Sequence, residues 1–160
     1  MMKIKVGFGY DVHRLEEGFD FWLGGIKIVH SKGSVGHSDG DTLIHAICDA
    51  MLGAANLRDI GNHFPDNDPS LKGIDSKILL KKTNDLIRSK GYVIGNIDST
   101  ICLQQPKIKP FIDEMQSALS KVLEISTEDI SIKATTTEKL GFAGREEGVA
   151  AYAVVLLQKE

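Results

Sequence analysis

The chain begins with a stretch in which apolar and polar side chains alternate, which is the pattern of a β-strand. Every second residue over 4–12 is apolar, and the positions between carry lysine, glycine and aspartate. The alternation predicts a buried strand that ends near GYDVHRL, with Asp11 and His13 pointing the same way. A second strand is predicted over 21–28, where two adjacent glycines indicate a bulge or bend, and it could pair with the first.

Three segments have the spacing of amphipathic helices. The first, of about 14 residues, follows HSDGD and has apolar residues at i, i+3, i+4 and i+7 positions from Ile44 to Ala55. Ser38 or Asp39 is predicted to cap it. The second helix is predicted over 76–90, before a glycine, and the third over 110–124, opened by a proline.

Three more strands are predicted over 92–103, 130–134 and 149–157, and the last is so apolar that both of its faces look buried. Residues 56–74 are rich in Gly, Pro, Asn and Asp, and a loop of that length favours a functional role. The order of elements predicts an α+β sandwich, with a mixed four-stranded sheet plus a small hairpin and helices on one face, in a ferredoxin-like arrangement. We expect residues 1–160 to form a single domain.

The chain has 160 residues, a formal net charge of −3 and 42% hydrophobic residues. These values are ordinary for a globular domain, and they give no electrostatic reason to expect a nucleic acid partner. No apolar run approaches the roughly 20 residues that cross a bilayer, and no signal or transit peptide is evident, so no membrane partner is expected. We therefore expect a cytoplasmic protein, or the mature form of an organellar one. Cys48 falls on the apolar face of the first predicted helix, where core packing is the expected role.

Asp11 and His13 are close enough on their strand face to share one partner. If the first predicted helix packs on that strand, His45 at the edge of its apolar stripe approaches the pair. One carboxylate and two imidazoles leave a coordination position open, which is typical of a catalytic zinc site. Asp49 is the predicted partner that orients the His45 ring. For each residue alone, a solvated strand end or a packing histidine is the alternative.

Two further segments suit phosphate groups. The helix start at HSDGD offers unpaired backbone N–H groups and the positive end of a helix dipole. The stretch KATTTEKLGF places three threonine hydroxyls beside Glu138, a carboxylate able to hold Mg²⁺ against phosphate oxygens. Together with a metal site, these segments predict a phosphate-bearing substrate.

These residues carry a resemblance that covers nearly the whole chain. The matching stretches, in order, are GYDVHRL, HSDGD followed by His45, LRDIGNHFPDNDP, GNIDSTI, QPK and KATTTEKLGFAGREEG. The chain resembles the 2-C-methyl-D-erythritol 2,4-cyclodiphosphate synthase family of the non-mevalonate isoprenoid pathway. The resemblance implies a phosphorus–oxygen lyase that uses metal ions.

The resemblance also implies roles for particular residues. One Zn²⁺ per subunit would be held by the ligand set given above, and Glu138 would bind a Mg²⁺ or Mn²⁺ that bridges the α- and β-phosphates. His37 and Thr136 would polarise the phosphates in the transition state. Residues 103–109 with 134–135 would form the cytidine pocket. The full set of implied substrate contacts is Asp11, Val12, His13, His37, Ser38, Asp59, Ile60, Gly61, Phe64, Pro65, Asp66, Asn67, Asp68, Leu103, Gln104, Gln105, Pro106, Lys107, Ile108, Lys109, Ala134, Thr135, Thr136, Thr137, Glu138, Phe142 and Arg145.

The implied reaction is an intramolecular phosphoryl transfer. In 4-diphosphocytidyl-2-C-methyl-D-erythritol 2-phosphate, the 2-phosphate attacks the β-phosphorus and CMP leaves. The resemblance further implies a homotrimer with active sites at the subunit interfaces, which would cover the second face of the last strand. Tyr152 stands where some members have a glutamate that faces Arg145, and Leu103 stands where a small residue is common.

Two other functions are alternatives to the cyclisation. A metal-dependent phosphohydrolase would use a similar cluster of Asp and His residues, and it would release phosphate or a nucleoside monophosphate without closing a ring. A non-catalytic nucleotide- or metal-binding module would have no need of Glu138 in addition to the Asp and His residues.

Overall fold

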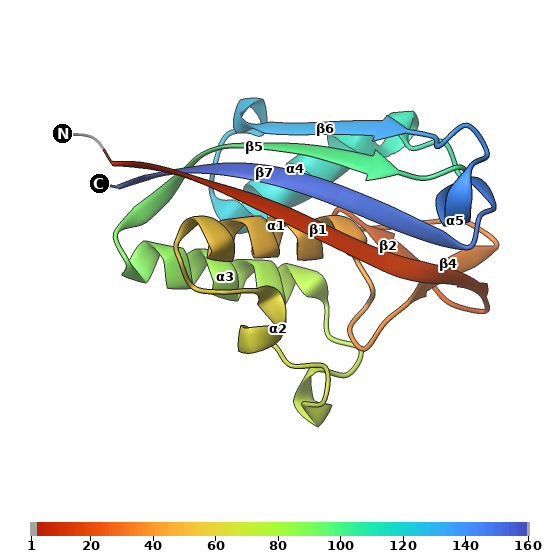
Figure 1. The fold of residues 1–160 in the computed structure, drawn as a ribbon, viewed down its shortest axis with the longest axis horizontal. Coiled ribbons are helices and arrows are strands. Elements are labelled where there is room, and N and C mark those ends of the chain that lie inside the picture. The colour runs from red at the N-terminus through yellow and green to blue at the C-terminus, as the bar shows by residue number, and fades with distance from the viewer. Residues whose placement is uncertain (1–2, 160) are drawn as a thin grey trace.

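The computed structural model describes residues 3–159, which form a five-stranded mixed sheet, a separate two-stranded hairpin and several helices (Figure 1). The sheet has the order β4-β1-β7-β5-β6, in which only β5 and β6 run parallel. Its strands are β1 (Ile4–Glu17), β4 (Lys32–Val35), β5 (Tyr92–Cys102), β6 (Ile130–Thr135) and β7 (Gly148–Lys159), and the hairpin consists of β2 (Phe21–Leu23) and β3 (Ile26–Ile28).

Five α-helices complete the described part of the chain. They are α1 (Thr42–Ala54), α2 (Ile60–His63), α3 (Ser76–Ser89), α4 (Ile112–Leu123) and α5 (Gly141–Gly144), with single 3-10 turns at Pro69–Leu71, Lys109–Phe111 and Thr127–Asp129. Within residues 3–159, no helix combines the length and the apolar character needed to cross a bilayer.

The α+β class, the mixed sheet, the small hairpin and the three long helices are as predicted, but the sheet has five strands instead of four. The additional strand, β4, pairs with the end of β1. Residues 21–28 form both strands of the hairpin and pair with each other, not with β1, because Gly24 and Gly25 take positive φ angles and turn the chain back. The connectivity also differs from the ferredoxin-like β-α-β-β-α-β order, since α4 lies between β5 and β6 and makes that pair parallel.

Helix α1 lies against β1 at very short range, and two glycines make this possible. A Cβ atom at Gly7 would lie 1.9 Å from the carbonyl oxygen of Ala50, and one at Gly9 would lie 1.9 Å from that of Ala46. Both distances are far inside van der Waals contact, so only glycine fits at either position. The approach brings the side chains of α1 level with the residues that follow Gly9 on the same strand face.

Asp41 caps α1, not Ser38 or Asp39 as the sequence suggested. Its fully buried carboxylate accepts hydrogen bonds from the backbone N–H groups of Ile44, Gly24 and Gly25, at 3.0, 2.9 and 2.7 Å. Burial raises the pKa of the Asp41 carboxyl, although these donors favour its ionised form. The same side chain therefore starts α1 and holds the β2–β3 hairpin against it.

The opposite face of the sheet is apolar and exposed in the single chain. Val6 and Phe8 of β1 keep 65% and 62% of their surface exposed, and Tyr152 and Val154 of β7 are exposed beside them. The rings of Tyr10 and Tyr152 lie 5.1 Å apart, so the face is a continuous apolar surface. The last strand, predicted to be buried on both faces, is covered in one chain only on the face toward the helices.

Candidate active site

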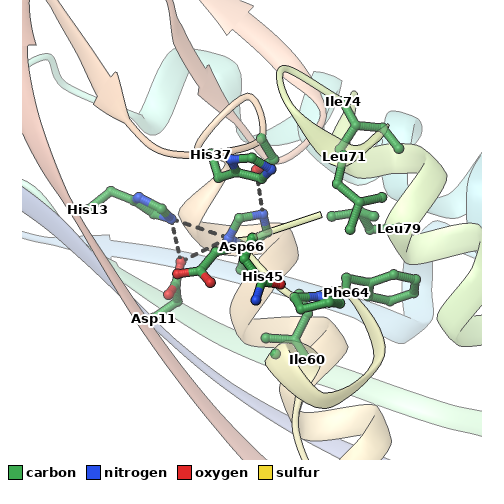
Figure 2. Close-up of a pocket in the computed structure, with 14 residues that line it drawn as sticks. Asp11, His13, His37, His45, Ile60, Phe64, Asp66, Leu71, Ile74 and Leu79 are labelled. Atoms are coloured by element: carbon green, nitrogen blue, oxygen red, sulfur yellow. Dashed lines mark hydrogen bonds and ion pairs between the residues drawn. The ribbon is translucent and has the colours of Figure 1, made fainter. Parts of the chain in front are cut away.

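Asp11, His13 and His45 converge at the junction of β1 and α1 (Figure 2). Oδ2 of Asp11 lies 3.0 Å from Nε2 of His13 and 3.2 Å from Nδ1 of His45. The two imidazole nitrogens are 3.2 Å from each other. The three predicted metal ligands are thus assembled by alternation along one strand and by the glycine-mediated approach of α1.

A hydrogen bond at Nδ1, the ring nitrogen that does not face the cluster, fixes the orientation of the His13 ring. Its Nδ1 lies 2.8 Å from the carbonyl oxygen of Val35, the last residue of β4. A carbonyl oxygen only accepts, so Nδ1 carries the proton and donates it. The lone pair of the neutral ring is therefore on Nε2, which faces Asp11 and His45. Strand β4, missed in the sequence, supplies this support.

The three ligand atoms fit a metal ion. Tetrahedral zinc with nitrogen and oxygen ligands at about 2.0–2.1 Å would place those ligands about 3.3 Å apart, close to the 3.0–3.2 Å found here. Oδ2 of Asp11 is buried and has no hydrogen-bond partner among residues 3–159 other than the ring nitrogens it faces. Two neutral imidazoles and a carboxylate would repel each other at this range, and a bound cation relieves that repulsion.

The contacts within the cluster also shift the pKa values of Asp11 and His13. Burial alone would raise the pKa of Asp11, but hydrogen bonds to His13 and His45 outweigh it and hold the pKa below its ordinary value. Burial would likewise lower the pKa of His13, but the hydrogen bond to Asp11 outweighs burial and raises it. A proton at this cluster therefore competes with a metal ion for the same ligand atoms.

The cluster opens into a pocket of about 510 Å³ between β1, α1, α2 and the start of α3 (Figure 2). Its predicted lining residues are Asp11, His13, His37, Ser38, His45, Ile60, Gly61, Phe64, Pro65, Asp66 and Asn67. Leu71, Ile74 and Leu79 also line it and were missed in the sequence. The only sequence signal for Leu71 and Ile74 was the unusual length of the irregular segment 56–74.

The loop that carries His37 is hydrogen-bonded to Asp68 and Gly73. Nε2 of His37 donates to the carbonyl oxygen of Asp68 at 2.8 Å, and the His37 carbonyl accepts from the N–H of Gly73 at 2.7 Å. These bonds hold the ring at the pocket wall, and Nδ1 has no hydrogen-bond partner among residues 3–159. Asp68 thus acts through its backbone, and its carboxylate caps the next turn by accepting from the N–H of Ser70.

Asp49 does not orient His45, contrary to the sequence-based prediction. Its Oδ1 accepts a hydrogen bond from the N–H of Ile60 at 3.2 Å and so fixes the start of α2. Asp59 caps that helix by accepting from the N–H of Asn62 at 2.8 Å. Both carboxylates therefore shape the pocket wall, whereas Nε2 of His45 lies near Ser38 and Ser76.

Residues 103–109 and 134–138 do not line this pocket in the described chain. They meet each other at the ends of β5 and β6, where the N–H of Leu103 donates to the carbonyl oxygen of Thr135 at 3.0 Å. In the sheet, β7 lies between β5 and the β1 strand that carries the metal ligands. One chain therefore holds the predicted metal pocket and the predicted cytidine segments as two separate groups.

Glu138 is exposed in a strained turn after β6. Glu138 and Lys139 take φ angles of 54° and 63°, in the left-handed region that side chains other than glycine seldom adopt. Such residues cost of order 1–3 kcal/mol each and concentrate at functional sites. The turn leaves the Glu138 side chain exposed to solvent. Among residues 3–159, Glu138 is not part of a cluster of metal-ligating side chains.

The remaining predicted contacts, Val12, Phe142 and Arg145, lie in or near the segment that leads into the start of β7 or on the strand paired with it. Val12 and Phe142 line a second cavity of about 410 Å³ together with Lys32 and Glu147. Arg145 pairs with Glu147, at 3.0 and 3.2 Å, so a carboxylate partner exists although position 152 carries tyrosine. This pairing raises the pKa of Arg145 and lowers that of Glu147.

Comparison with known proteins gives a consistent result. The sequence profile of the YgbB family matches residues 4–158. A relative from Bacteroides fragilis, named 2-C-methyl-D-erythritol 2,4-cyclodiphosphate synthase, is 66% identical over 158 residues, which cover 99% of each chain.

Two solved structures match the fold closely. The bifunctional IspDF from Campylobacter jejuni superimposes with a TM-score of 0.96 at 43% identity, covering 100% of this chain and 43% of that one. A CDP-bound form of 2C-methyl-D-erythritol-2,4-cyclodiphosphate synthase superimposes with a TM-score of 0.88 at 36% identity, covering 96% of this chain and 99% of that one.

Proposed function

The chain belongs to the YgbB family, and we infer that it is a lyase that forms 2-C-methyl-D-erythritol 2,4-cyclodiphosphate. The substrate is 4-diphosphocytidyl-2-C-methyl-D-erythritol 2-phosphate, and CMP is released. The observation that carries this conclusion is the half-buried cluster of Asp11, His13 and His45 in the lining of a pocket, in a chain 66% identical to a synthase of that name.

The metal at the cluster is proposed to be zinc, one ion per subunit. Two imidazole nitrogens and one carboxylate oxygen are ligands that zinc favours, and three protein ligands leave a position for substrate. When bound there, zinc would supply Lewis-acid polarisation of a phosphate oxygen. We propose that Glu138 holds Mg²⁺ or Mn²⁺, because hard cations bind through one or two carboxylates together with substrate phosphates.

The chemistry needs position and charge more than it needs a base. An oxygen of the 2-phosphate, already anionic, forms a bond to the β-phosphorus, while the bond from that phosphorus to the CMP oxygen breaks and its electron pair leaves with CMP. The pocket is proposed to orient the methylerythritol end, so that the 2-phosphate oxygen is held close to the β-phosphorus. His37, held by Asp68, is proposed to donate from Nδ1 to a phosphate oxygen when protonated, and Thr136 to donate its hydroxyl.

The cytidine end is proposed to bind the segments at the ends of β5 and β6. Residues 103–109 and 134–135 lie together there, and Gln104 accepts a hydrogen bond from the N–H of Lys139 next to Glu138. A cytidyl group in these segments would place its diphosphate beside the Glu138 turn. The CDP-bound relative supports a cytidine nucleotide as ligand of this fold.

We further propose that the working unit is a homotrimer with active sites shared between neighbours. The predicted metal pocket and cytidine segments are separate within one chain, so a neighbour is needed to bring them together. Packing of three sheets around an axis would bury the exposed apolar face, which is formed by Val6, Phe8, Tyr10, Tyr152 and Val154. We propose that residues 1–160 form one domain, located in the cytoplasm as predicted from the sequence.

The test of this function is product identity. Purified protein supplied with Zn²⁺, Mg²⁺ and the cytidyl substrate is followed by ³¹P NMR. We expect the substrate phosphate resonances to be replaced by those of a cyclic diphosphate, with CMP in equal amount. Inorganic phosphate, or CMP with an open-chain 2,4-bisphosphate, would indicate a phosphohydrolase and contradict the proposal.

A further inference from the structure

A hydrogen-bonded chain of three side chains runs from the buried start of α3 to the metal cluster. Ser76, the first residue of α3, is fully buried, and its Oγ donates to Oδ1 of Asp39 at 2.5 Å. The same oxygen lies 3.0 Å from Nε2 of His45. Asp39, Ser76 and His45 thus form a line that ends at the imidazole whose other nitrogen faces Asp11.

The hydrogen bonds of Asp39 determine which way the hydroxyl of Ser76 donates. Its Oδ2 accepts from the N–H of Ser76 at 2.9 Å, and its Oδ1 also accepts from the N–H of Asp41 at 3.1 Å. A carboxylate only accepts hydrogen bonds, so the hydroxyl proton of Ser76 is committed to Asp39. With its proton engaged, Ser76 can only accept at the His45 side.

The proton on His45 is placed by this direction. Because Ser76 accepts, Nε2 of His45 must be the protonated nitrogen, and the lone pair of the neutral ring is on Nδ1. Nδ1 is the atom 3.2 Å from Oδ2 of Asp11. In the metal-free protein that carboxylate would attract a proton to Nδ1, so the Ser76 contact opposes a tautomer that would block metal binding.

We propose that Asp39 and Ser76 are positioning residues that fix His45 in the tautomer with Nδ1 unprotonated, so that the cluster accepts a metal ion without first rearranging a proton. They determine which ring nitrogen of His45 carries the proton, as the carbonyl of Val35 does for His13. The inference rests on the metal site of the proposed function. Partners of this kind typically change metal affinity by about 10–100-fold.

Ser38 is a weaker partner of the same nitrogen. Its Oγ lies 3.1 Å from Nε2 of His45 and accepts from the N–H of Gly40 at 3.3 Å. Its own proton is not committed to a carboxylate, so Ser38 can either donate or accept. Ser38 therefore permits both tautomers of His45, and only the chain through Ser76 selects between them.

The tautomer can be measured without any metal. Apo protein labelled with ¹⁵N-histidine is studied by long-range ¹H–¹⁵N correlation at about pH 9, well above the ordinary imidazole pKa, and His45 is assigned with His45→Asn. We expect the protonated-nitrogen shift at Nε2 and the lone-pair shift at Nδ1. A proton on Nδ1 of wild-type His45 would overturn the proposal.

Two variants test the cause, and they act in different ways. Ser76→Ala removes the acceptor, so His45 should populate both tautomers. Asp39→Asn turns an acceptor into an amide that can donate to Ser76, which frees the serine proton for Nε2 and should favour the Nδ1–H tautomer. Competition with a chromophoric chelator should show zinc affinity lowered about 10–100-fold in both variants.

The matched control is Ser99→Ala, which removes another buried serine hydroxyl that donates one hydrogen bond, here to the carbonyl oxygen of Ser131. It should leave both the His45 tautomer and the zinc affinity unchanged. Unaltered zinc affinity in folded Ser76→Ala and Asp39→Asn, or an equal loss in Ser99→Ala, would overturn the proposal. Failure of the wild-type protein to bind zinc, with Nε2 protonated, would instead contradict the proposed metal site and leave the tautomer assignment standing.

Discussion

At the scale of residues, the pocket is organised around the cluster of Asp11, His13 and His45. Val35 holds His13, the Asp39–Ser76 pair holds His45, and both rings then direct lone pairs at the oxygen of Asp11. Without a proton or a metal ion, the lone pairs of the two rings and the Asp11 oxygen repel each other. Small side-chain rotations would relieve this repulsion. We therefore regard the cluster as built for metal.

His45→Ala tests the ligand assignment. Two remaining ligands hold zinc poorly, so bound zinc and activity should both be lost while the fold is retained. The loss of affinity should exceed the roughly 10–100-fold cost of removing a supporting partner. Elemental analysis and circular dichroism measure the two properties. His30→Ala, at a histidine that lies against Phe21, is the control and should keep its zinc. Full zinc occupancy in His45→Ala would show that the ligands are elsewhere.

Glu138→Gln tests the second metal. An amide is a poorer ligand for Mg²⁺ than a carboxylate, so the half-saturating Mg²⁺ concentration should rise by about tenfold or more while zinc content is unchanged. Titration of activity with Mg²⁺ measures this. Glu128→Gln, at another exposed glutamate, should behave as wild type. An unaltered Mg²⁺ requirement in Glu138→Gln would mean that this carboxylate does not bind the ion.

Sequence alone could predict that Asp11, His13 and His45 come together, but not which residues support them. Asp11 and His13 share a strand face by simple alternation, and His45 follows once α1 is placed on that face. Ser76 lies 31 positions beyond His45, and its contact with the ring depends on the path of the intervening loop. For the same reason Asp49 was the wrong choice: helical spacing places it near His45, but the fold uses it to start α2.

At the scale of elements, the approach of α1 to β1 decides whether the cluster exists. Gly7 and Gly9 leave no room for a side chain beneath Ala50 and Ala46. The alternating pattern marks these glycines as the polar face of the strand, although they form its most closely packed part. Periodicity cannot reveal this, because glycine on a strand face is equally compatible with exposure and with close packing.

Gly9→Ala tests this packing. The added methyl would overlap the carbonyl of Ala46, so α1 must move away from β1, with an expected loss of about 1–3 kcal/mol in the free energy of unfolding or more. The same movement separates His45 from Asp11, so zinc affinity should fall as well. Gly53→Ala in α1, where no atom lies within 4 Å of an added Cβ, should instead stabilise the protein by about 0.5–1 kcal/mol. Chemical denaturation that places both variants at wild-type stability would contradict the account.

The strands show where local pattern is sufficient and where it is not. The long strands β1, β5 and β7 could be predicted from their apolar residues, whereas β4 consists of KGSV and has no apolar alternation to detect. Its pairing is imposed by β1, which continues to Glu17, beyond the predicted end near GYDVHRL. The hairpin turn at Gly24 and Gly25 was visible as two glycines, but its role in pairing β2 with β3 was not.

At the scale of the whole molecule, one chain is incomplete in two respects. Its sheet exposes a continuous apolar face, and its predicted metal pocket and predicted cytidine segments do not meet. Both features are explained if three chains pack their sheets around an axis and each pocket is closed by a neighbour's β5–β6 edge. We therefore propose that the metal pocket of one subunit works with the cytidine segment of the next.

Mixing two inactive variants tests this claim most directly. His45→Ala disables the metal pocket, and Lys107→Glu disables the exposed cytidine segment, so neither should be active alone. In randomly mixed trimers at equal amounts, an interface is intact when the Lys107→Glu chain supplies the pocket and the His45→Ala chain supplies the segment. This occurs at about one quarter of interfaces, so we predict recovery of about a quarter of wild-type activity once native mass spectrometry proves subunit exchange. No recovery despite proven exchange, or a monomer in solution, would contradict the shared site.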